Sequence, residues 1–457
     1  MQSGEDILVS VLMPVYNAET YLEEAIESIF HQTYKKLELL ALYDNSTDGT
    51  WEILKEYAQK DKRLKILMLP HRGIAAALNI GLDAAKGKYI ARMDADDISL
   101  PDRFAVQVAY MEEHPQVGVC AAQMRSFQDN GVWVGNQAVT AMNAEELKAG
   151  MLFQCMIGHP TVMFRKDIMA RDNWKYHTDV LCEDFDLWSR MIETVPFVLL
   201  PDILLNYRYN EYSITKNRAN DVFLSSCEIV RRALEKVLKI DTKNYKLFDF
   251  RGIHQAIWLD EPIVGHFKRQ NQLLHEIYNN NQKLEYCNCE YLSGFIKRKW
   301  KFLFRNFGLM DQCSEKCQEI DLTKPCCDFS GDLAQEVGRI AEDLIGEMAL
   351  PKTAVIYGAG IRGRKLMEQW DGLSSCGKLV WKLAGVADRR ETGMVYQGKK
   401  IDCIKPSELS ALNYDYILVS TDIYYDEIKT EMRSAGIPEG KIYHAGILNL
   451  LSKRIRK

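Results

Sequence analysis

Three aspartates, Asp94, Asp96 and Asp97, follow directly after a segment that the sequence predicts as a strand over 88–93. Carboxylates on alternate residues at a strand end can converge on one hard cation, and such a cation can hold two phosphate oxygens of a nucleoside diphosphate. This chemistry would neutralise a leaving group. The structural alternative is a solvated acidic loop in which Asp97 caps the following helix.

A second acidic pair, Glu183 and Asp184, opens a predicted helix that also carries Trp188. Acidic residues stabilise the first turn of a helix through the helix dipole, which is the structural explanation for this pair. A functional carboxylate at this place would act as a general base for a hydroxyl, and Trp188 would offer a platform for a sugar face.

Polar side chains also follow the first two predicted strands, at the edge where open α/β sheets bind ligands. After Pro14, Tyr16 can stack on a flat ring, and Asn17 and Glu19 offer groups for a ribose or base. Asp44 ends the second strand and can accept the imino hydrogen of a pyrimidine. Turn formation and helix capping are the alternatives for both segments.

Arg72 and Gly73 open a predicted helix of small residues that includes Asn79. Such a helix permits close backbone approach, and the arginine suits a phosphate or a sugar. Tight helix packing explains the alanines equally well. His159 stands alone between Gly158 and Pro160, where a structural role is the simpler interpretation.

Composition places these residues in an ordinary globular protein of two or three domains, with 457 residues, 47% apolar and 26% charged. The net charge of -5 excludes a strong nucleic-acid footprint. No apolar run approaches ~18 residues and no signal peptide is evident, so we expect a cytoplasmic protein. The basic segment 453–457 would allow peripheral contact with an anionic membrane, although a frayed tail is the simpler explanation.

The elements that must position the site alternate β-rich runs with amphipathic stretches, which is typical of a sheet covered by helices. The expected strands span 9–14, 37–43, 64–69 and 88–93, and the expected helices span 18–32 and 50–61. Helical periodicity dominates from about 214 to 350. Cysteines concentrate between Cys287 and Cys327, but their spacings do not match a zinc site.

A second α/β unit begins near Lys352, with expected strands over 353–357, 380–387 and 416–420 and a helix over 364–370. A glycine-rich turn, Gly358, Gly360 and Gly363, follows its first strand, and Asp388 ends the next one. This is the context of a dinucleotide-binding fingerprint. No catalytic set of a dehydrogenase accompanies it, so a packing or docking role is favoured over NAD binding.

Taken together, the N-terminal motifs resemble the family 2 glycosyltransferases of the GT-A fold, over roughly Ile7 to Arg208. The motifs occur in order along the chain: Pro14-Val15-Tyr16-Asn17, Asp44-Asn45-Ser46-Thr47-Asp48-Gly49-Thr50, Gly73 with Ala77, Asn79 and Gly81, Asp94-Ala95-Asp96-Asp97, and Glu183-Asp184-Phe185-Asp186-Leu187-Trp188. The resemblance implies an α/β GT-A domain over 1–213, and the patterns beyond it predict a helical region over 214–350 and a small Rossmann-like domain over 351–457.

The resemblance also implies roles for single residues in an inverting transfer from a nucleotide-diphosphate sugar. Asp184 would be the base, Asp96 would ligate Mn²⁺ or Mg²⁺, and Asp94 would contact the ribose or sugar or share the metal. Asp44 and the 14–19 loop would hold the nucleotide base. The acceptor-side residues would be His159, Glu183, Trp188 and Arg208.

The sequence departs from the family pattern at two places. Asn45 stands where a second acidic residue is common, and Asn210 stands where a histidine is common. The expected donor is a UDP-sugar, and the expected acceptor is a hydroxyl of a saccharide or lipid-linked saccharide in surface polysaccharide synthesis. Two alternatives remain: an NAD-dependent oxidoreductase or epimerase centred on Gly358 to Asp388, and a catalytically silent sugar-nucleotide-binding protein.

Overall fold

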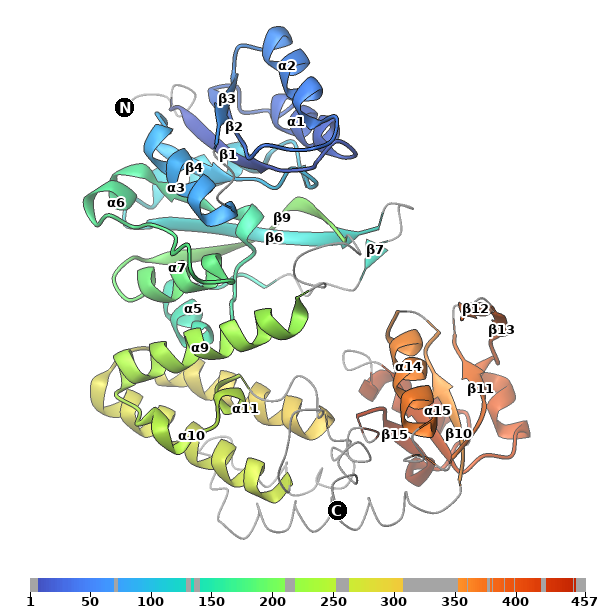
Figure 1. The fold of residues 1–457 in the computed structure, drawn as a ribbon. Helices are drawn as coiled ribbons and strands as arrows, with labels where there is room; N and C mark the ends of the chain where they lie inside the picture. The colour runs from blue at the N-terminus through green and yellow to red at the C-terminus, as the bar shows by residue number, and fades with distance from the viewer. Residues whose placement is uncertain are drawn as a thin grey trace. The chain divides into compact units, whose positions relative to one another are not determined.

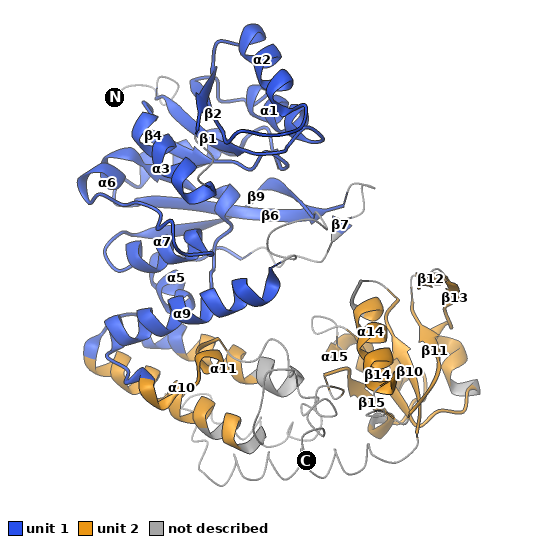
Figure 2. Ribbon diagram, viewed as in Figure 1, with its two compact units in different colours: residues 1–242, 284–292 blue, residues 243–283, 293–457 orange. Residues whose placement is uncertain are grey.

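The computed structural model describes residues 7–69, 73–128, 133–134, 140–209, 218–251, 263–306, 352–359, 361–375, 379, 381–389, 391–397, 399–420, 425–446 and 448. The chain divides into two compact units, residues 1–242 with 284–292 and residues 243–283 with 293–457 (Figure 2). Within the described residues, no helix has the length and apolar character needed to cross a membrane.

The first unit is built on a mixed sheet of nine strands (Figure 1). Its strands are β1 (Val9–Val15), β2 (Leu37–Tyr43), β3 (Leu64–Met68), β4 (Tyr89–Arg92), β5 (Ile98–Ser99), β6 (Val119–Phe127), β7 (Trp133–Val134), β8 (Met163–Arg165) and β9 (Phe197–Arg208). Their order is β3-β2-β1-β4-β8-β6-β9-β5, with β7 paired to β6.

The parallel half of this sheet brings the strand ends with polar residues to one edge. Strands β3, β2, β1 and β4 are parallel, whereas β8 is antiparallel to both β4 and β6. The register pairs Val15 with Tyr43 and Leu12 with Arg92. The loops after β1, β2 and β4 therefore leave the sheet at the same edge, where open α/β sheets bind ligands.

Helices cover both faces of the sheet because its central strands are apolar on both sides. The helices of this unit are α1 (Leu22–Phe30), α2 (Thr50–Lys60), α3 (Ile74–Ala84), α4 (Arg103–Glu113), α5 (Ala144–Met151), α6 (Lys166–Arg171), α7 (Glu183–Met191) and α9 (Ala219–Leu238). One core joins α1, α2 and α4 to the face of β1 that carries Val9, Val11 and Met13. On the opposite face, Gly81 of α3 lies against Leu12 and Leu42.

The second unit contains most of α10 (Ile263–Leu284) and α11 (Cys289–Asn306), followed by a small α/β domain. A buried Asp249 accepts hydrogen bonds from His266 at 3.1 Å and Arg269 at 2.6 Å, which fixes the start of α10. The domain's elements are β10 (Thr353–Tyr357), α14 (Ile361–Ser375), β11 (Lys382–Ala387), β12 (Gly393–Tyr396), β13 (Lys399–Asp402), β14 (Tyr416–Val419), α15 (Tyr425–Ser434) and β15 (Ile442–His444). Its four-stranded sheet is parallel, in the order β11-β10-β14-β15.

Candidate functional site

The three aspartates after β4 converge as the sequence predicts. Oxygen atoms from Asp94, Asp96 and Asp97 all lie within 4.8 Å of one another. Burial and the charge of Asp94 raise the pKa of Asp96 to about 6, and the same two causes raise the pKa of Asp97 well above its usual value. Asp97 accepts the Arg208 N–H at 2.8 Å through Oδ1, while its buried Oδ2 has no hydrogen-bond partner in the described residues. Burial and mutual repulsion therefore make it unfavourable to ionise all three carboxyl groups at once.

The last residue of β4, Arg92, is a buried cation beside this cluster. Its guanidinium forms an ion pair with Asp94. Although burial opposes the charged form, the Asp94 carboxylate outweighs it and raises the pKa of Arg92. A second buried arginine, Arg103 of α4, donates to the Arg92 carbonyl at 2.7 Å and holds the strand end in place. Sequence analysis missed Arg92, because its importance depends on the residues that the fold packs around it.

Those residues include the acidic pair at the start of α7. Burial and the charge of Asp184 raise the pKa of Glu183 to about 7, and burial raises the pKa of Asp184. The Phe185 N–H donates to Asp184 at 2.7 Å, and this bond together with the charge of Arg92 acts in the opposite direction. The acidic cluster after β4 and the acidic pair on α7 therefore both interact electrostatically with Arg92, at the edge of the sheet.

His159 lies in the wall of this region. Burial lowers the pKa of His159 well below its usual value, and the Arg92 charge adds to the effect, so the ring is neutral. Its Nε2 lies 2.9 Å from the Tyr176 hydroxyl, and its Nδ1 lies 3.9 Å from Glu183. A neutral, buried ring of this kind supports the α7 pair by packing rather than by carrying charge.

Trp188 is not the sugar platform that the sequence predicts. Its side chain is 0% exposed, so both ring faces contact protein. Its ring neighbours are His159, Phe164, Tyr176 and Phe197. The residue anchors α7 on the sheet and thereby fixes the position of Asp184 at the start of the same helix.

The loop after β1 also differs from the expectation for two of its side chains. Asn17 accepts the Thr47 N–H at 2.8 Å, and Glu19 accepts the Gly49 N–H at 2.9 Å. Both side chains therefore tie this loop to the loop after β2, instead of pointing to a ribose or base. Tyr16, in contrast, is 51% exposed and lies where a flat ring can stack.

Asp44 follows β2 and Tyr16 follows β1, at the same edge of the sheet. Asp44 is buried and accepts the Gly73 N–H at 3.2 Å. Gly73 has a φ of 80°, which explains why a glycine begins α3. Asn79 of α3 does not have the donor-binding role that the sequence predicts. Its amide donates to the Tyr176 carbonyl and accepts the Tyr176 N–H, both at 2.9 Å, so it holds the loop that carries Tyr176.

Other predicted residues have simpler placements. Pro14 lies inside β1, and Arg72 lies outside the described residues. Arg208 is buried, and its guanidinium stacks on the ring of Tyr21. It donates to the Asp96 carbonyl at 2.8 Å and pairs with Glu24, so it holds the acidic loop in place. Arg208 therefore stabilises the loop of the three aspartates and is not an acceptor contact.

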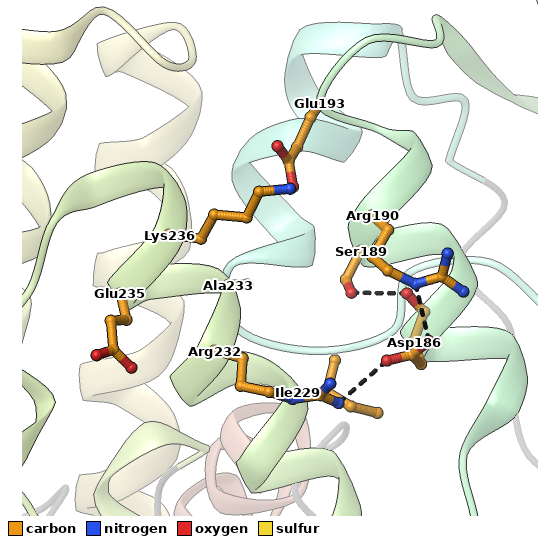
Figure 3. Close-up of a pocket in the computed structure, with 9 residues that line it drawn as sticks. All are labelled: Asp186, Ser189, Arg190, Glu193, Ile229, Arg232, Ala233, Glu235 and Lys236. Carbon is orange, nitrogen blue, oxygen red and sulfur yellow. Dashed lines mark hydrogen bonds and ion pairs between the residues drawn. The ribbon is translucent and has the colours of Figure 1, made fainter. Parts of the chain in front are cut away.

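A cavity of about 370 Å³ lies between α7 and α9 (Figure 3). Most of its charged side chains pair with one another, whereas Glu235 pairs with Arg231 outside the lining. Asp186 binds Arg190 at 2.9 Å and Arg232 at 3.0 Å, and Lys236 binds Glu193 at 2.8 Å. These pairs join the helix of Asp184 to α9, so the cavity is a structural junction.

In the C-terminal domain, the glycine turn has the close geometry that its sequence predicts. Gly358 has a φ of 113°, and a Cβ on Gly363 would lie 1.7 Å from the Gly358 carbonyl oxygen. Asp388 accepts the Ala359 N–H at 2.7 Å, so this acid braces the turn. Gly360 lies outside the described residues. Of the cysteines between Cys287 and Cys327, the structure describes Cys287, which is buried, and Cys289, which is partly buried.

The mixed sheet with carboxylates at its carboxyl edge has the GT-A fold of a glycosyltransferase, which is the fold that the sequence predicts. A family model described as glycosyl transferase family 2 matches residues 10–180. A second, described as C2185-like, N-terminal, matches residues 351–443.

Two curated relatives are similar over most of their own length. The O-antigen biosynthesis glycosyltransferase WbnJ of Escherichia coli is 32% identical over 216 residues, which cover 46% of this chain and 83% of that protein. The amylovoran biosynthesis glycosyltransferase AmsE of Erwinia amylovora is 32% identical over 235 residues, which cover 50% of this chain and 86% of that protein. Among solved structures, S. aureus TarS 1-349 in complex with UDP-GlcNAc is 17% identical, with a TM-score of 0.42. The match covers 74% of this chain and 92% of that one. The chain belongs to glycosyltransferase family 2.

Proposed function

We propose that this glycosyltransferase moves a hexosyl or hexosaminyl group, with inversion, from a nucleoside-diphosphate sugar to a saccharide hydroxyl. The observation that carries the proposal is the convergence of Asp94, Asp96 and Asp97 at a sheet edge, facing Glu183 and Asp184. The first group suits a leaving diphosphate, and the second suits an attacking hydroxyl.

The acidic cluster fits a divalent cation. Its oxygens come from separate carboxylates within 4.8 Å, one buried oxygen of Asp97 has no hydrogen-bond partner in the described residues, and burial together with the charge of Asp94 raises the pKa of Asp96. Asp94 and Asp96 would hold Mn²⁺ or Mg²⁺, which prefer oxygen ligands. A bound cation supplies charge neutralisation for the departing diphosphate.

The nucleotide would bind over the loops after β1 and β2. Tyr16 exposes half of its side chain for stacking, and Asp44 offers a carboxylate to a pyrimidine base, which favours a UDP-sugar. Asn17 and Glu19 contribute by keeping the two loops joined. A preorganised loop loses less conformational freedom on binding.

Asp184 would act as the general base. As the acceptor oxygen bonds to the anomeric carbon, Asp184 takes the hydroxyl proton, and the carbon–oxygen bond to the diphosphate breaks on the opposite side of the sugar. The base must be ionised to take the proton; burial raises the pKa of Asp184, whereas the Phe185 N–H and Arg92 favour its charged form. Neutral His159 adds no competing charge.

The biological role follows from the relatives' names. WbnJ is described as an O-antigen biosynthesis enzyme and AmsE as an amylovoran biosynthesis enzyme. Both polymers are polysaccharides, so we infer a role in building a surface polysaccharide or its lipid-linked precursor. The acceptor would then be a growing saccharide.

Thermal unfolding with a panel of nucleoside diphosphates and Mn²⁺ tests the donor site. A ligand at 100 times its Kd adds about 2.7 kcal/mol of stability. We expect one nucleotide to stabilise the native chain only with Mn²⁺, and Asp96→Ala to lose this effect. Asp202→Asn, which removes an exposed carboxylate on β9, is the matched control. Stabilisation by NAD alone, unchanged in Asp96→Ala, would contradict the proposal.

A further inference from the structure

Among the tryptophans in the described part of the chain, Trp133 on β7 is the one that is exposed to solvent. Its side chain is 50% exposed, whereas Trp188 is fully buried. Tryptophan is enriched at binding interfaces because its ring combines a large apolar face with a hydrogen-bonding N–H group. The ring is therefore a candidate for the platform that Trp188 cannot provide.

The ring is held in a defined orientation. The Arg125 guanidinium carbon lies 4.0 Å from the Trp133 ring centroid, and Arg125 in turn donates from Nε to Asn206 Oδ1 at 2.8 Å. The Phe127 ring lies 5.8 Å away, tilted by 56°. These neighbours fix the indole without covering it, which lowers the entropic cost of binding a ligand.

A row of paired residues connects Trp133 to the acidic cluster. Trp133 pairs with Phe127 across β7 and β6, and Phe127 pairs with Arg208 across β6 and β9. Arg208 then donates to Asp97 Oδ1 and to the Asp96 carbonyl, both at 2.8 Å. Neighbouring strands are ~4.8 Å apart, so Trp133 stands ~10 Å from Arg208, within reach of a short saccharide that starts at the site.

We propose that Trp133, Arg125 and Asn206 form a saccharide subsite that binds a sugar residue of the acceptor, distant from the reacting hydroxyl. The C–H face of a sugar ring suits the electron-rich face of indole, and its hydroxyls suit the guanidinium and amide beside it. The inference rests on the proposed transferase function. It adds that the acceptor is an oligosaccharide, because Trp133 stands two strand spacings, ~10 Å, from Arg208 at the acidic cluster.

An array of immobilised bacterial oligosaccharides, probed with the full chain, tests this subsite. We expect the native protein to bind a subset of the glycans. Trp133→Ala should weaken that binding at least ten-fold, and Trp133→Phe should restore part of it because a ring face returns. Val395→Ala removes an exposed apolar side chain from the other unit and should bind like the native chain.

Nucleotide-dependent thermal stabilisation, measured on the same samples, separates the two proposals. Glycan binding that is unchanged in Trp133→Ala, or absent from the native chain, overturns the subsite even where Mn²⁺ and a nucleoside diphosphate stabilise the protein. A native chain that no nucleotide stabilises contradicts the donor site instead. If Trp133→Ala converts a dimer to a monomer in sedimentation, the ring is an interface between copies and the subsite is wrong.

Discussion

Replacing Asp96 by asparagine should stabilise the metal-free protein at the same time as it destroys the cation site. Burial and the charge of Asp94 raise the pKa of Asp96 from 3.8 to about 6. The native state therefore binds this proton more tightly than the unfolded state. The stability it contributes is fully present below about pH 4 and is lost as the pH rises through about 6.

The size of the effect follows from the shift. A rise of about two pKa units corresponds to a loss of about 3 kcal/mol in the free energy of unfolding by pH 8. Asparagine keeps the shape of the side chain without the charge, so Asp96→Asn should gain up to about 3 kcal/mol at pH 8 in EDTA. For a unit of this size that is a rise in Tm of roughly 6 to 12 °C. At pH 4 the two proteins should unfold alike.

Thermal unfolding followed by circular dichroism at pH 4 and pH 8, with EDTA, measures this difference. Asp202→Asn is the control, because its carboxylate is exposed and should change nothing. An Asp96→Asn protein that is no more stable than the native chain at pH 8 would refute the idea that burial and the Asp94 charge disfavour the ionised Asp96 carboxylate. The convergence of the three carboxylates would then be the remaining argument for a cation at this site.

Three further changes test other parts of the structure. Asp184→Asn should lower donor turnover by ~10² to 10⁴-fold while nucleotide-dependent stabilisation stays, because only the base is lost; a coupled assay of released nucleoside diphosphate measures it. Asn79→Ala should cost about 1 to 3 kcal/mol in urea unfolding, since the Tyr176 backbone loses two hydrogen bonds. Gly363→Ala should unfold the C-terminal domain, because its Cβ would lie 1.7 Å from the Gly358 carbonyl oxygen, and proteolysis should then cleave this domain while nucleotide binding survives.

The elements themselves could be predicted from the sequence because local signals define them. The strand over 37–43 and the strand over 353–357 have the predicted bounds. The helix expected over 18–32 is shorter, Leu22–Phe30, because residues 17–19 instead bond to the loop after β2. The helix expected over 364–370 is longer, Ile361–Ser375.

Side-chain roles were harder to predict because they depend on contacts between distant segments. The convergence of Asp94, Asp96 and Asp97 followed from strand alternation, which is local. Whether a tryptophan is covered depends on the whole sheet, so Trp188 was placed wrongly and Trp133 was overlooked. The Asn-Gly pair at 130–131 is a hairpin signal that would have pointed to the strand carrying Trp133.

The corrected residues share one cause. Asn17, Glu19 and Asn79 were assigned to a donor because polar groups near a strand end suit a ligand. In the structure each satisfies backbone groups of a neighbouring loop. Backbone N–H and C=O groups in loops need hydrogen-bond partners, and so do the polar groups of a ligand. The sequence alone does not show whether a polar side chain bonds to the backbone or to a ligand.

The most direct test of the central claim is the release of nucleoside diphosphate from a panel of sugar nucleotides, with Mn²⁺ and a mixture of saccharide acceptors. The account predicts that the native chain consumes one donor, that EDTA stops the reaction, and that Asp184→Asn is nearly inactive although it still binds the nucleotide. Consumption that continues unchanged in Asp184→Asn, or a native chain that binds a nucleoside diphosphate and consumes no donor, would contradict it.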